Sequence, residues 1–428
     1  MLYTGLPRGL VYTLTRRAVT HRHSGDAEAM LSTLPLTSEL ADGRLANLPE
    51  LSVVLPCLNE EATVALCIEQ IRKTLQANHI SGEIIVADNG SADRSREIAR
   101  DMGARVVLVE SRGYGNALMG GINAAQGKYI VMGDADCSYD FSQIPIFLDK
   151  LRAGYELVVG NRFRGGIRPG AMPFLHQYFG NPLLTGVGRL FFKAPCHDFY
   201  CGLRGFTRAA YERMGLRTTG MEFANEMVVK ASLFKMSLCE VPTTLSPDGR
   251  RGRSHLRTWH DGWRGLRFLL LYSPRWLFFY PGLGLLLVGS AGALWLLPGT
   301  RRVGHVFLDI HTLLYAVVAM LTGFQAVVFA FFTKVFAITE GLLPEDPRLT
   351  RAFRVFNLEK GLLGGTVLLI TGMGIASHSL YLWNRAGFGP MNPVVLVRLV
   401  AAAMVSITLG VETIFASFFL SILGLARK

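Results

Sequence analysis

The stretch Tyr129-Ile-Val-Met-Gly-Asp-Ala-Asp-Cys-Ser-Tyr-Asp140 joins a short apolar run to a turn that carries two closely spaced carboxylates. The run Tyr129–Met132 predicts a buried β-strand. Where this strand runs into the turn, Asp134 and Asp136 can both approach one divalent ion, and that ion can neutralise a diphosphate. An Asp-x-Asp pair alone is a weak signal, because aspartates in turns are usually only solvated. The pair therefore predicts a metal site only together with the segments around it.

Four further apolar runs alternate with helical stretches on both sides of this strand. They are Leu51–Leu55, Glu83–Ala87, Arg105–Val109 and Glu156–Val159. Between the first two, residues 60–77 keep apolar side chains on one helical face, and Asn59 is placed to cap this helix. The alternation predicts an α/β domain with a largely parallel, Rossmann-like sheet, whose ligands bind at the carboxyl ends of the strands.

Polar residues follow the predicted strands at the edge where such a ligand would bind. After the first two strands these are Asn59, Glu60, Asp88, Asn89 and Asp93, and Pro56 stands with them at the end of the first strand. Further along, Gly113 and Gly115 permit close backbone approach, and Arg112 can balance phosphate charge. This segment is not a G-x-G-x-x-G fingerprint. The cluster predicts a site for the base, ribose and phosphates of a nucleotide.

The second half of the chain predicts a membrane domain. The 428 residues are 50% hydrophobic and only 18% charged, which is too apolar for an average soluble protein of this size. Four apolar spans are predicted at 276–297, 307–332, 361–383 and 397–424, and crossing a bilayer needs about 20 residues each. The connection from Lys334 to Lys360 holds more Lys and Arg than the other two connections, so it is expected on the cytoplasmic side.

The predicted organisation has four parts: a poorly ordered extension at 1–50, the sheet domain at 51–250, a juxtamembrane amphipathic helix region at 251–275 and the membrane domain at 276–428. An even number of spans then puts the sheet domain and both termini in the cytoplasm. Within the extension, a short interfacial helix at 9–17 and a true start at Met30 are open alternatives. Gln325 and Glu412 fall inside spans, where they either form helix-to-helix hydrogen bonds or line a path for lipid.

The region after Gly249 alternates cations with large apolar residues. Leu256, Trp259, Trp263, Leu266 and Leu270 are spaced by three or four, which places them on one face of a helix lying in the lipid headgroup region. Packing of that face on the sheet domain is the alternative. The formal charge of +12 comes partly from Arg residues beside the spans, and this favours a membrane partner over nucleic acid.

Ordered motifs along residues 51–256 resemble the family 2 glycosyltransferases of the GT-A fold, in particular the polyprenyl-phosphate hexose synthases such as dolichol-phosphate mannose or glucose synthase. The motifs are Leu55-Pro-Cys-Leu-Asn-Glu-Glu61, Ala87-Asp-Asn-Gly-Ser-Ala-Asp93, Gly133-Asp-Ala-Asp-Cys-Ser138, Val159-Gly-Asn-Arg-Phe163, Asp198-Phe-Tyr-Cys-Gly-Leu-Arg-Gly-Phe206, Met221–Lys230 and Glu240-Val-Pro-Thr-Thr244.

The resemblance implies a hexosyltransferase that moves a sugar from a nucleotide-sugar, of the GDP-mannose or UDP-glucose type, to polyprenyl (dolichyl or undecaprenyl) phosphate. Direct displacement with inversion is expected. Asp88 would bind the donor nucleotide, and Asp134 and Asp136 would hold Mg²⁺ or Mn²⁺. The remaining implied residues are Arg162 and Arg204 at phosphate groups, Glu222 and Glu226 near the sugar or acceptor, and Arg251, Arg253, Ser254 and His255 in a basic lip at the acceptor phosphate.

Two segments depart from the family pattern. Cys137-Ser-Tyr-Asp140 replaces the usual residues after the carboxylate pair, which puts donor contacts past Asp136 in doubt. His255 stands where the family has lysine, so phosphate binding at the lip is expected to depend on pH.

Three other functions remain open at this stage: a transferase acting on another lipid, a processive polysaccharide synthase, and a non-catalytic membrane scaffold or lipid carrier. The synthase is disfavoured because Tyr272-Ser-Pro-Arg-Trp276 lacks the glutamine of its Gln-x-x-Arg-Trp element. The intact aspartates 88, 134 and 136 disfavour the scaffold. A homo-oligomer also remains open.

Overall fold

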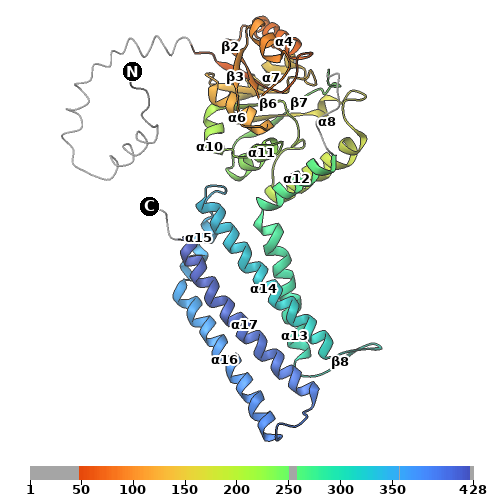
Figure 1. The fold of residues 1–428 in the computed structure, drawn as a ribbon, viewed down its shortest axis with the longest axis vertical. Helices are drawn as coiled ribbons and strands as arrows, with labels where there is room; N and C mark the ends of the chain where they lie inside the picture. Colours follow the sequence, from red (N-terminus) through yellow and green to blue (C-terminus); the bar gives the residue numbers. More distant parts are fainter. Residues whose placement is uncertain (1–47, 250–257, 356, 425–428) are drawn as a thin grey trace, which may run out of the picture. The chain divides into compact units, whose positions relative to one another are not determined.

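The computed structural model describes residues 48–249, 258–355 and 357–424, and the described residues from Glu50 onward belong to one compact unit (Figure 1). Its first part is a seven-stranded sheet in the order β3-β2-β1-β4-β6-β5-β7. The strands are β1 (Leu51–Cys57), β2 (Gly82–Asp88), β3 (Arg105–Leu108), β4 (Tyr129–Met132), β5 (Leu157–Asn161), β6 (Arg204–Thr207) and β7 (Leu238–Pro242).

The sheet is largely parallel, as the alternation of strands and helices predicts. β1 pairs in parallel with β2 and β4, β2 with β3, and β5 with β7. The exception is β6, which lies antiparallel between β4 and β5. The sequence patterns predicted neither β6 nor β7, because Arg204-Gly-Phe-Thr and Leu238-Cys-Glu-Val-Pro are short and have no run of β-branched residues.

Helices cover both faces of the sheet. They are α4 (Val64–Ala77), α5 (Ser95–Asp101), α6 (Tyr114–Ala124), η1 (Phe141–Gln143), α7 (Ile144–Arg152), α8 (Arg162–Gly165), η2 (His176–Gly180), α9 (Asn181–Phe192), α10 (Arg208–Met214) and α11 (Phe223–Leu233). α6 packs on β1, β2 and β3, while α7 packs on β4 to β7. The contact of α6 is close at Gly121, where a Cβ would lie 2.5 Å from Val54 Cγ1. This packing fixes the β1, β2 and β4 ends that carry the polar residues.

The predicted helix at residues 60–77 exists, but the proposed Asn59 cap is wrong. The helix begins at Val64, and residues 61–63 form a turn. Asn59 has a left-handed φ of 59° and its Oδ1 accepts a hydrogen bond of 2.8 Å from the Ala92 amide. Its side chain therefore joins the loop after β1 to the loop after β2.

The second part of the chain is helical. After α12 (Thr258–Leu271) come η3 (Arg275–Phe279), α13 (Tyr280–Leu296), the hairpin of β8 (Arg301–Val303) and β9 (Val306–Leu308), α14 (Ile310–Thr339), α15 (Pro347–Val355), α16 (Leu358–Arg385) and α17 (Pro393–Gly424). Four helical stretches are long and apolar enough to cross a membrane: Arg275–Leu296, α14, α16 and α17. The four predicted spans are thereby confirmed. α14 runs beyond the predicted end at 332, so Lys334 lies in a helix rather than in a connection.

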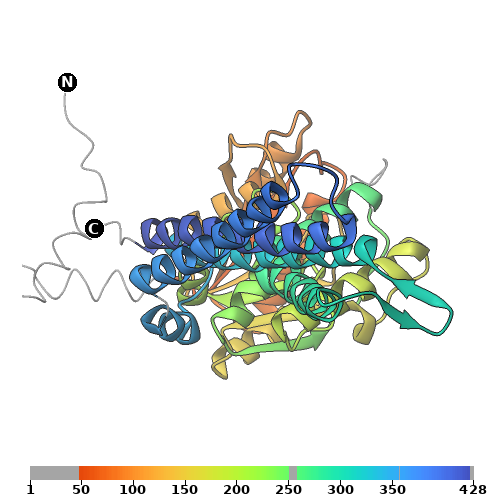
Figure 2. The same cartoon turned by 90° about the horizontal axis from the view of Figure 1, so that it is seen from below.

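Glycines allow the membrane helices to approach each other closely. A Cβ at Gly323 of α14 would lie 2.3 Å from the backbone nitrogen of Leu286 on α13, and one at Gly289 would lie 2.4 Å from that of Met320. Gly372 of α16 similarly faces the backbone of α17. Figures 1 and 2 both show α16 running beside α17. Small residues at these contacts suit helix packing in lipid, where close van der Waals contact replaces hydrophobic burial.

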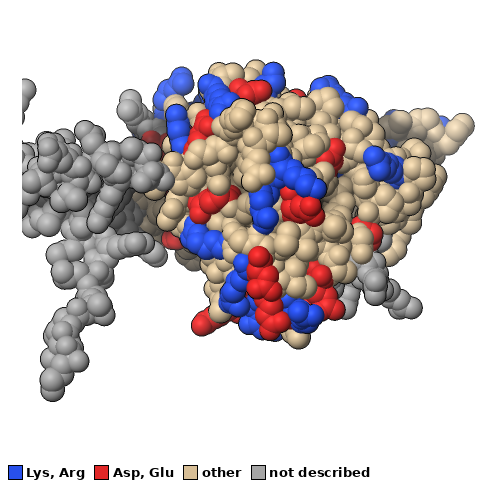
Figure 3. Space-filling view, turned by 90° about the horizontal axis from the view of Figure 1, so that it is seen from above, with Lys and Arg blue, Asp and Glu red and all other residues tan. Residues whose placement is uncertain are grey.

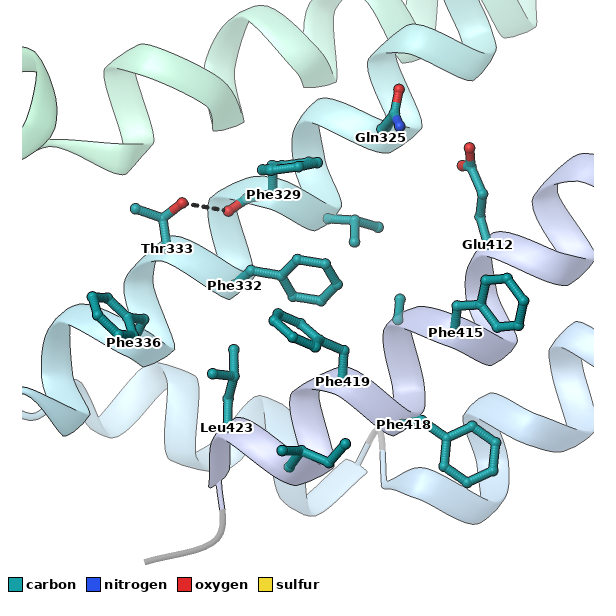
Figure 4. A pocket seen from close by; sticks show the side chains of 13 residues that line it. Gln325, Phe329, Phe332, Thr333, Phe336, Glu412, Phe415, Phe418, Phe419 and Leu423 are labelled. Carbon is teal, nitrogen blue, oxygen red and sulfur yellow. Dashed lines mark hydrogen bonds between the residues drawn. The ribbon is translucent and has the colours of Figure 1, made fainter. Parts of the chain in front are cut away.

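A cavity of about 760 Å³ lies between α14 and α17 (Figure 4). Gln325 and Glu412 lie at one end of it, and phenylalanines of both helices line the rest. Glu412 Oε2 is buried and has no hydrogen-bond partner among the described residues. The two intramembrane polar residues thus line one shared cavity.

Candidate functional site

The loop after β2 is organised by Asp88. Its carboxylate is buried and accepts hydrogen bonds from the amides of Gly90 (3.1 Å) and Ser91 (3.2 Å). Arg96 Nε lies 3.9 Å from the same carboxylate. Asp88 therefore fixes the shape of its own loop, and its exposed fraction of 1% leaves little of its surface for a ligand.

Asn89 connects this loop to the segment before α6. Its Nδ2 donates to the carbonyls of Val109 (3.0 Å) and Ser111 (2.7 Å), and its Oδ1 accepts from the Gly113 amide (2.7 Å). Gly113 has φ 132°, and a Cβ there would lie 2.3 Å from the Thr219 carbonyl oxygen. Only glycine fits this conformation and this space, so the expectation of close backbone approach at Gly113 has a structural reason.

The loops after β1 and β2 are also tied together. The Glu60 amide donates to Ser95 Oγ (2.7 Å), and the Glu61 amide donates to Asp93 Oδ2 (3.1 Å). Burial acts to raise the pKa of Asp93, but hydrogen bonds from Ser95 and from backbone amides outweigh it and lower that pKa. Pro56 pairs with Ala87 across the two strands. The two loops that carry the residues predicted to bind the nucleotide-sugar are therefore held together by hydrogen bonds at the carboxyl ends of β1 and β2. Arg112 is exposed, and its guanidinium group lies next to Gly90.

The carboxylate pair follows β4 in a bend. Tyr114 donates its hydroxyl proton to Asp134 Oδ1 at 2.9 Å, and Asp136 Oδ1 accepts from the Ser138 amide at 3.0 Å. Burial, together with the charge of Asp134, raises the pKa of Tyr114, so the phenol keeps its proton and remains a donor. Asp134 is half-buried and Asp136 is 8% exposed. Tyr114 thus orients the first carboxylate from α6.

This donor set fits a hard divalent cation. No group of three or more His, Cys, Asp and Glu side chains in the described residues is placed to hold a metal ion by itself. Mg²⁺ is commonly bound by one or two carboxylates, with substrate phosphates and water supplying the other ligands. Two aspartates at a strand end match that requirement. The residues Cys196, His197 and Cys201 match it less well, because thiols are poor ligands for Mg²⁺, both cysteines are buried, and His197 contacts Glu240 at 3.0 Å.

The two implied phosphate-binding arginines are buried and already bound within the protein. Arg162 donates from Nε and Nη2 to the two carboxylate oxygens of Asp198, each at 2.7 Å. Arg204 is fully buried and donates to the carbonyls of Cys201 (2.8 Å) and Phe199 (2.6 Å). Both guanidinium groups therefore bind to the segment of residues 198–201. A contact between either arginine and a phosphate group stays a prediction.

Glu222 and Glu226 contact the helix that leads to the membrane. The Glu222 carboxylate accepts hydrogen bonds from Nε and Nη2 of Arg264 on α12, at 2.7 and 3.0 Å. Glu226 is fully buried, and it binds Lys230 Nζ at 2.8 Å and the Tyr272 hydroxyl at 3.0 Å. These contacts join α11 to α12 and to the segment after it. A role for either glutamate near the sugar or acceptor also stays a prediction.

The four residues proposed for the basic lip, Arg251, Arg253, Ser254 and His255, lie outside the described residues. The predicted pH dependence of phosphate binding at that lip therefore stays a prediction.

Two residues of the site were not anticipated as such. Tyr114 lies between Gly113 and Gly115 in the sequence, and its contact with Asp134 depends on the packing of α6 on β1. Asp198 was quoted only as the start of a motif, and its pairing with Arg162 joins positions 36 residues apart. The motif carried a signal for Asp198, since a buried charge of either sign needs a partner.

Comparisons with known proteins agree with this architecture. Residues 52–215 match the family described as glycosyl transferase family 2, and residues 331–424 match the glycosyltransferase family 2 C-terminal transmembrane region. The chain is 38% identical over 404 residues to the low-salt glycan biosynthesis hexosyltransferase Agl6 of Haloferax volcanii, covering 94% of this chain and 93% of Agl6.

Two further similarities cover about half of this chain. A dolichyl-phosphate hexose transferase of the same organism is 30% identical over 194 residues, covering 45% of this chain and 81% of the relative. The crystal structure of glucosyl-3-phosphoglycerate synthase from Mycobacterium tuberculosis with Mn²⁺, UDP and glucosyl-3-phosphoglycerate has a TM-score of 0.41 and 23% identity, covering 52% of this chain and 78% of that one.

Proposed function

This chain is a membrane-embedded hexosyltransferase of glycosyltransferase family 2, and we propose that it transfers a hexose from a nucleotide-sugar to a polyprenyl phosphate with inversion at the anomeric carbon. One arrangement carries the proposal. The carboxylates Asp134 and Asp136 follow β4 in a domain that continues through α12 and η3 directly into the first span. A polar donor site and a lipid environment therefore belong to one compact unit.

The names of two relatives support this choice of substrates. Agl6 is named as a hexosyltransferase of glycan biosynthesis, and a second relative is named as a dolichyl-phosphate hexose transferase. In the proposal, the donor is of the GDP-mannose or UDP-glucose type, and its nucleotide binds along the loops held by Asp88, Asn89 and Asn59. Arg112, exposed beside Gly90, faces the phosphates.

The chemistry needs cations more than it needs a base. A phosphate monoester has a second pKa of about 6 and is already largely anionic at neutral pH, so the acceptor does not have to be deprotonated by a side chain. Asp134 and Asp136 would hold Mg²⁺ or Mn²⁺, which would offset the charge of the leaving diphosphate. Tyr114 contributes by keeping its proton on the hydrogen bond to Asp134 Oδ1, which fixes the direction of that carboxylate.

The sheet domain is proposed to face the cytoplasm, where nucleotide-sugars are available. Between α14 and α16 the chain carries Arg348 and Arg351 on α15, and Lys360 follows in the first turn of α16; cationic connections of this kind remain on the cytoplasmic side. Figure 3 shows one face of the molecule on which Lys and Arg are interleaved with Asp and Glu rather than gathered in one area. The charge of +12 is therefore not concentrated on that face.

The test uses the full chain, purified in detergent with Mg²⁺ or Mn²⁺, polyprenyl phosphate and a panel of radiolabelled nucleotide-sugars. We expect label in the organic phase with one donor, and an inverted anomeric configuration in the product. Asp136→Asn keeps an acceptor for the Ser138 amide but removes the charge, so it should abolish transfer. The matched control is Asp101→Asn, a loss of the same charge at the exposed end of α5, which should leave transfer unchanged.

Two results would overturn the proposal. Label that appears only on diacylglycerol, ceramide or another lipid would assign a different acceptor. Full transfer by Asp136→Asn would remove the carboxylate pair from the mechanism.

A further inference from the structure

Two of the six cysteines lie against each other beside the carboxylate pair. The Sγ atom of Cys67 on α4 and that of Cys137, in the turn after β4, are 3.5 Å apart, and neither thiol is in a disulfide. All six cysteines fall within residues 48–249, and in this described segment no other two of their thiols are within hydrogen-bond distance. Cys67 and Cys137 are therefore the two thiols that can react with each other after a small movement of the chain.

The two thiols differ in how easily a molecule in solution can reach them. Cys67 is 1% exposed and lies on the buried side of α4. Cys137 is half-buried, and its backbone has a left-handed φ of 62°, which is uncommon for a residue with a Cβ. Cysteines that sense oxidants are typically accessible and have a second, resolving cysteine next to them. This arrangement makes Cys137 the thiol that reacts first and Cys67 the thiol that resolves.

A disulfide between these cysteines requires a definite movement. The sulfur atoms must approach by about 1.5 Å, from 3.5 Å to the bond length of about 2.05 Å. Cys67 is held in a helix whose neighbouring residues Ile68 and Ile71 are fully buried in the core. Cys137 lies in a half-buried turn, so we expect it to make most of this movement.

A movement of Cys137 reaches the carboxylate pair directly, because Asp136 is the residue before it. Asp136 Oδ1 accepts a hydrogen bond from the Ser138 amide at 3.0 Å, and the Asp136 carbonyl accepts one from the Gly249 amide at 2.8 Å. These bonds hold the turn in its present shape on both sides of Cys137. A functional group has to stay within about 0.5 Å of its productive position, so closing the disulfide should displace Asp136 too far.

We propose that Cys67 and Cys137 are a reversible thiol-modification site, at which a small disulfide oxidises the pair and thereby disables the carboxylate turn. Disulfides are rare in cytosolic proteins, where they usually serve redox sensing or catalysis. The reduced pair is then the active form, and the disulfide forms only under oxidising conditions. That the lost activity is sugar transfer rests on the proposed function.

The reaction is two successive thiol–disulfide exchanges. The Cys137 sulfur attacks one sulfur of the small disulfide, whose S–S bond breaks, and one thiol leaves with the proton of Cys137. The Cys67 sulfur then attacks the Cys137 sulfur of this mixed disulfide, and the second thiol leaves with the proton of Cys67. Two protein thiols are thereby oxidised to one disulfide, while one small disulfide is reduced to two thiols. An excess of a reducing thiol reverses both steps.

The first experiment treats the full chain, purified in detergent, with oxidised glutathione and then blocks the remaining thiols by alkylation. Mass spectrometry of the unreduced digest should show one peptide pair linked between Cys67 and Cys137, which disappears after treatment with dithiothreitol. In Cys67→Ser, glutathione should stay attached to Cys137, because the resolving thiol is gone. Cys239→Ser is the matched control, since it removes another half-buried thiol and should leave the linked pair unchanged.

Two results of this experiment would overturn the proposal. One is the absence of the linked pair in the oxidised wild type. The other is a Cys137 that carries no glutathione in Cys67→Ser, because the accessible thiol would then not be the one that reacts first.

The second experiment measures sugar transfer and the binding of Mn²⁺ with a nucleoside diphosphate in the same samples. Misplacing a group by 1 Å can cost about 100-fold in rate, so oxidation should slow transfer at least about tenfold, and dithiothreitol should restore it. Mn²⁺ binding should weaken in parallel. In Cys137→Ser, oxidised and untreated samples should agree within about twofold, since no disulfide can form.

The two experiments separate this proposal from the proposed function. A linked pair that changes neither transfer nor Mn²⁺ binding would show that the disulfide does not act on the carboxylate turn. If no sugar donor supports transfer even in the reduced chain, the proposed function fails, whereas the linked peptide and Mn²⁺ binding still decide whether the thiol pair is a switch.

Discussion

The side chains of Arg162 and Asp198 are joined by two hydrogen bonds of 2.7 Å each. This buried pair connects the two ends of the segment that contains η2 and α9. Removing one partner of a buried ion pair leaves the other charge without compensation, which costs about 3–5 kcal/mol. Asp198→Asn should therefore lower the unfolding midpoint of the sheet domain strongly. The check is thermal unfolding of the purified chain, followed by proteolysis. Glu97→Gln is the control, because the exposed pair with Arg94 is worth only about 0–1 kcal/mol. Equal midpoints for the two variants would contradict this account.

Glu222 and Arg264 couple α11 to α12. Because both bonds of this pair cross between the two helices, Arg264→Ala should loosen α12 from the sheet domain. Hydrogen exchange in the full chain should then increase along residues 258–271, while the exchange of β1 and β4 stays unchanged. Arg267→Ala provides the comparison, since Arg267 is an exposed cation on the same helix. If Arg267→Ala increases exchange as much, the pair is not what holds α12.

Tyr114 should matter through the direction of Asp134. Tyr114→Phe removes the hydroxyl that donates to Asp134 Oδ1 and changes little else in volume. Losing a residue that orients a metal ligand typically weakens metal binding by about 10–100-fold. Binding of Mn²⁺, measured by electron paramagnetic resonance with the nucleotide diphosphate present, should weaken by that factor. Tyr155→Phe, at a half-buried tyrosine before β5, should bind as the wild type does. Unchanged binding in Tyr114→Phe would show that the hydrogen bond does not orient a ligand.

Glu226 should make the stability of the sheet domain depend on pH. Burial acts to raise the pKa of Glu226, but the hydrogen bonds from Lys230 and Thr218 lower it by more. The pKa therefore lies below the ordinary value of 4.5. A lowered pKa stabilises the fold above the unfolded value, and this stability is lost as the pH falls through the folded pKa. Glu226→Gln should therefore be less stable than the wild type at pH 7, and the difference should shrink below about pH 4.5. Unfolding midpoints measured between pH 7 and pH 3 test this; a constant difference would count against it.

Gly323 and Gly284 provide a matched pair within the membrane domain. A Cβ at Gly323 would lie 2.3 Å from the Leu286 nitrogen, whereas among the described residues one at Gly284 would point into open space. Overpacking costs about 1–3 kcal/mol, so Gly323→Ala should lower the thermal midpoint in detergent and Gly284→Ala should not. Similar midpoints for the two variants would mean that α13 and α14 separate at no cost.

The sequence predicted the elements whose signals are local. Short apolar runs such as Tyr129–Met132, bounded by turn residues, indicate buried strands, and the length and composition of an apolar helix decide whether it can cross a bilayer. The motifs also indicated the family correctly. Local patterns failed at β6 and β7, which have no run of β-branched residues, and at Asn59, whose side chain bonds to the next loop instead of to the helix.

The partners of the charged residues were decided only by the tertiary structure. The sequence by itself placed Arg162, Glu222 and Glu226 in motifs of the family, and it indicated the α/β domain and the four apolar helices. The fold decided that Arg162 meets Asp198 and that both glutamates meet the α12 region. The physical reason is that a side chain's periodic position fixes which face of its own helix or strand it lies on, whereas its partner depends on how distant segments cross.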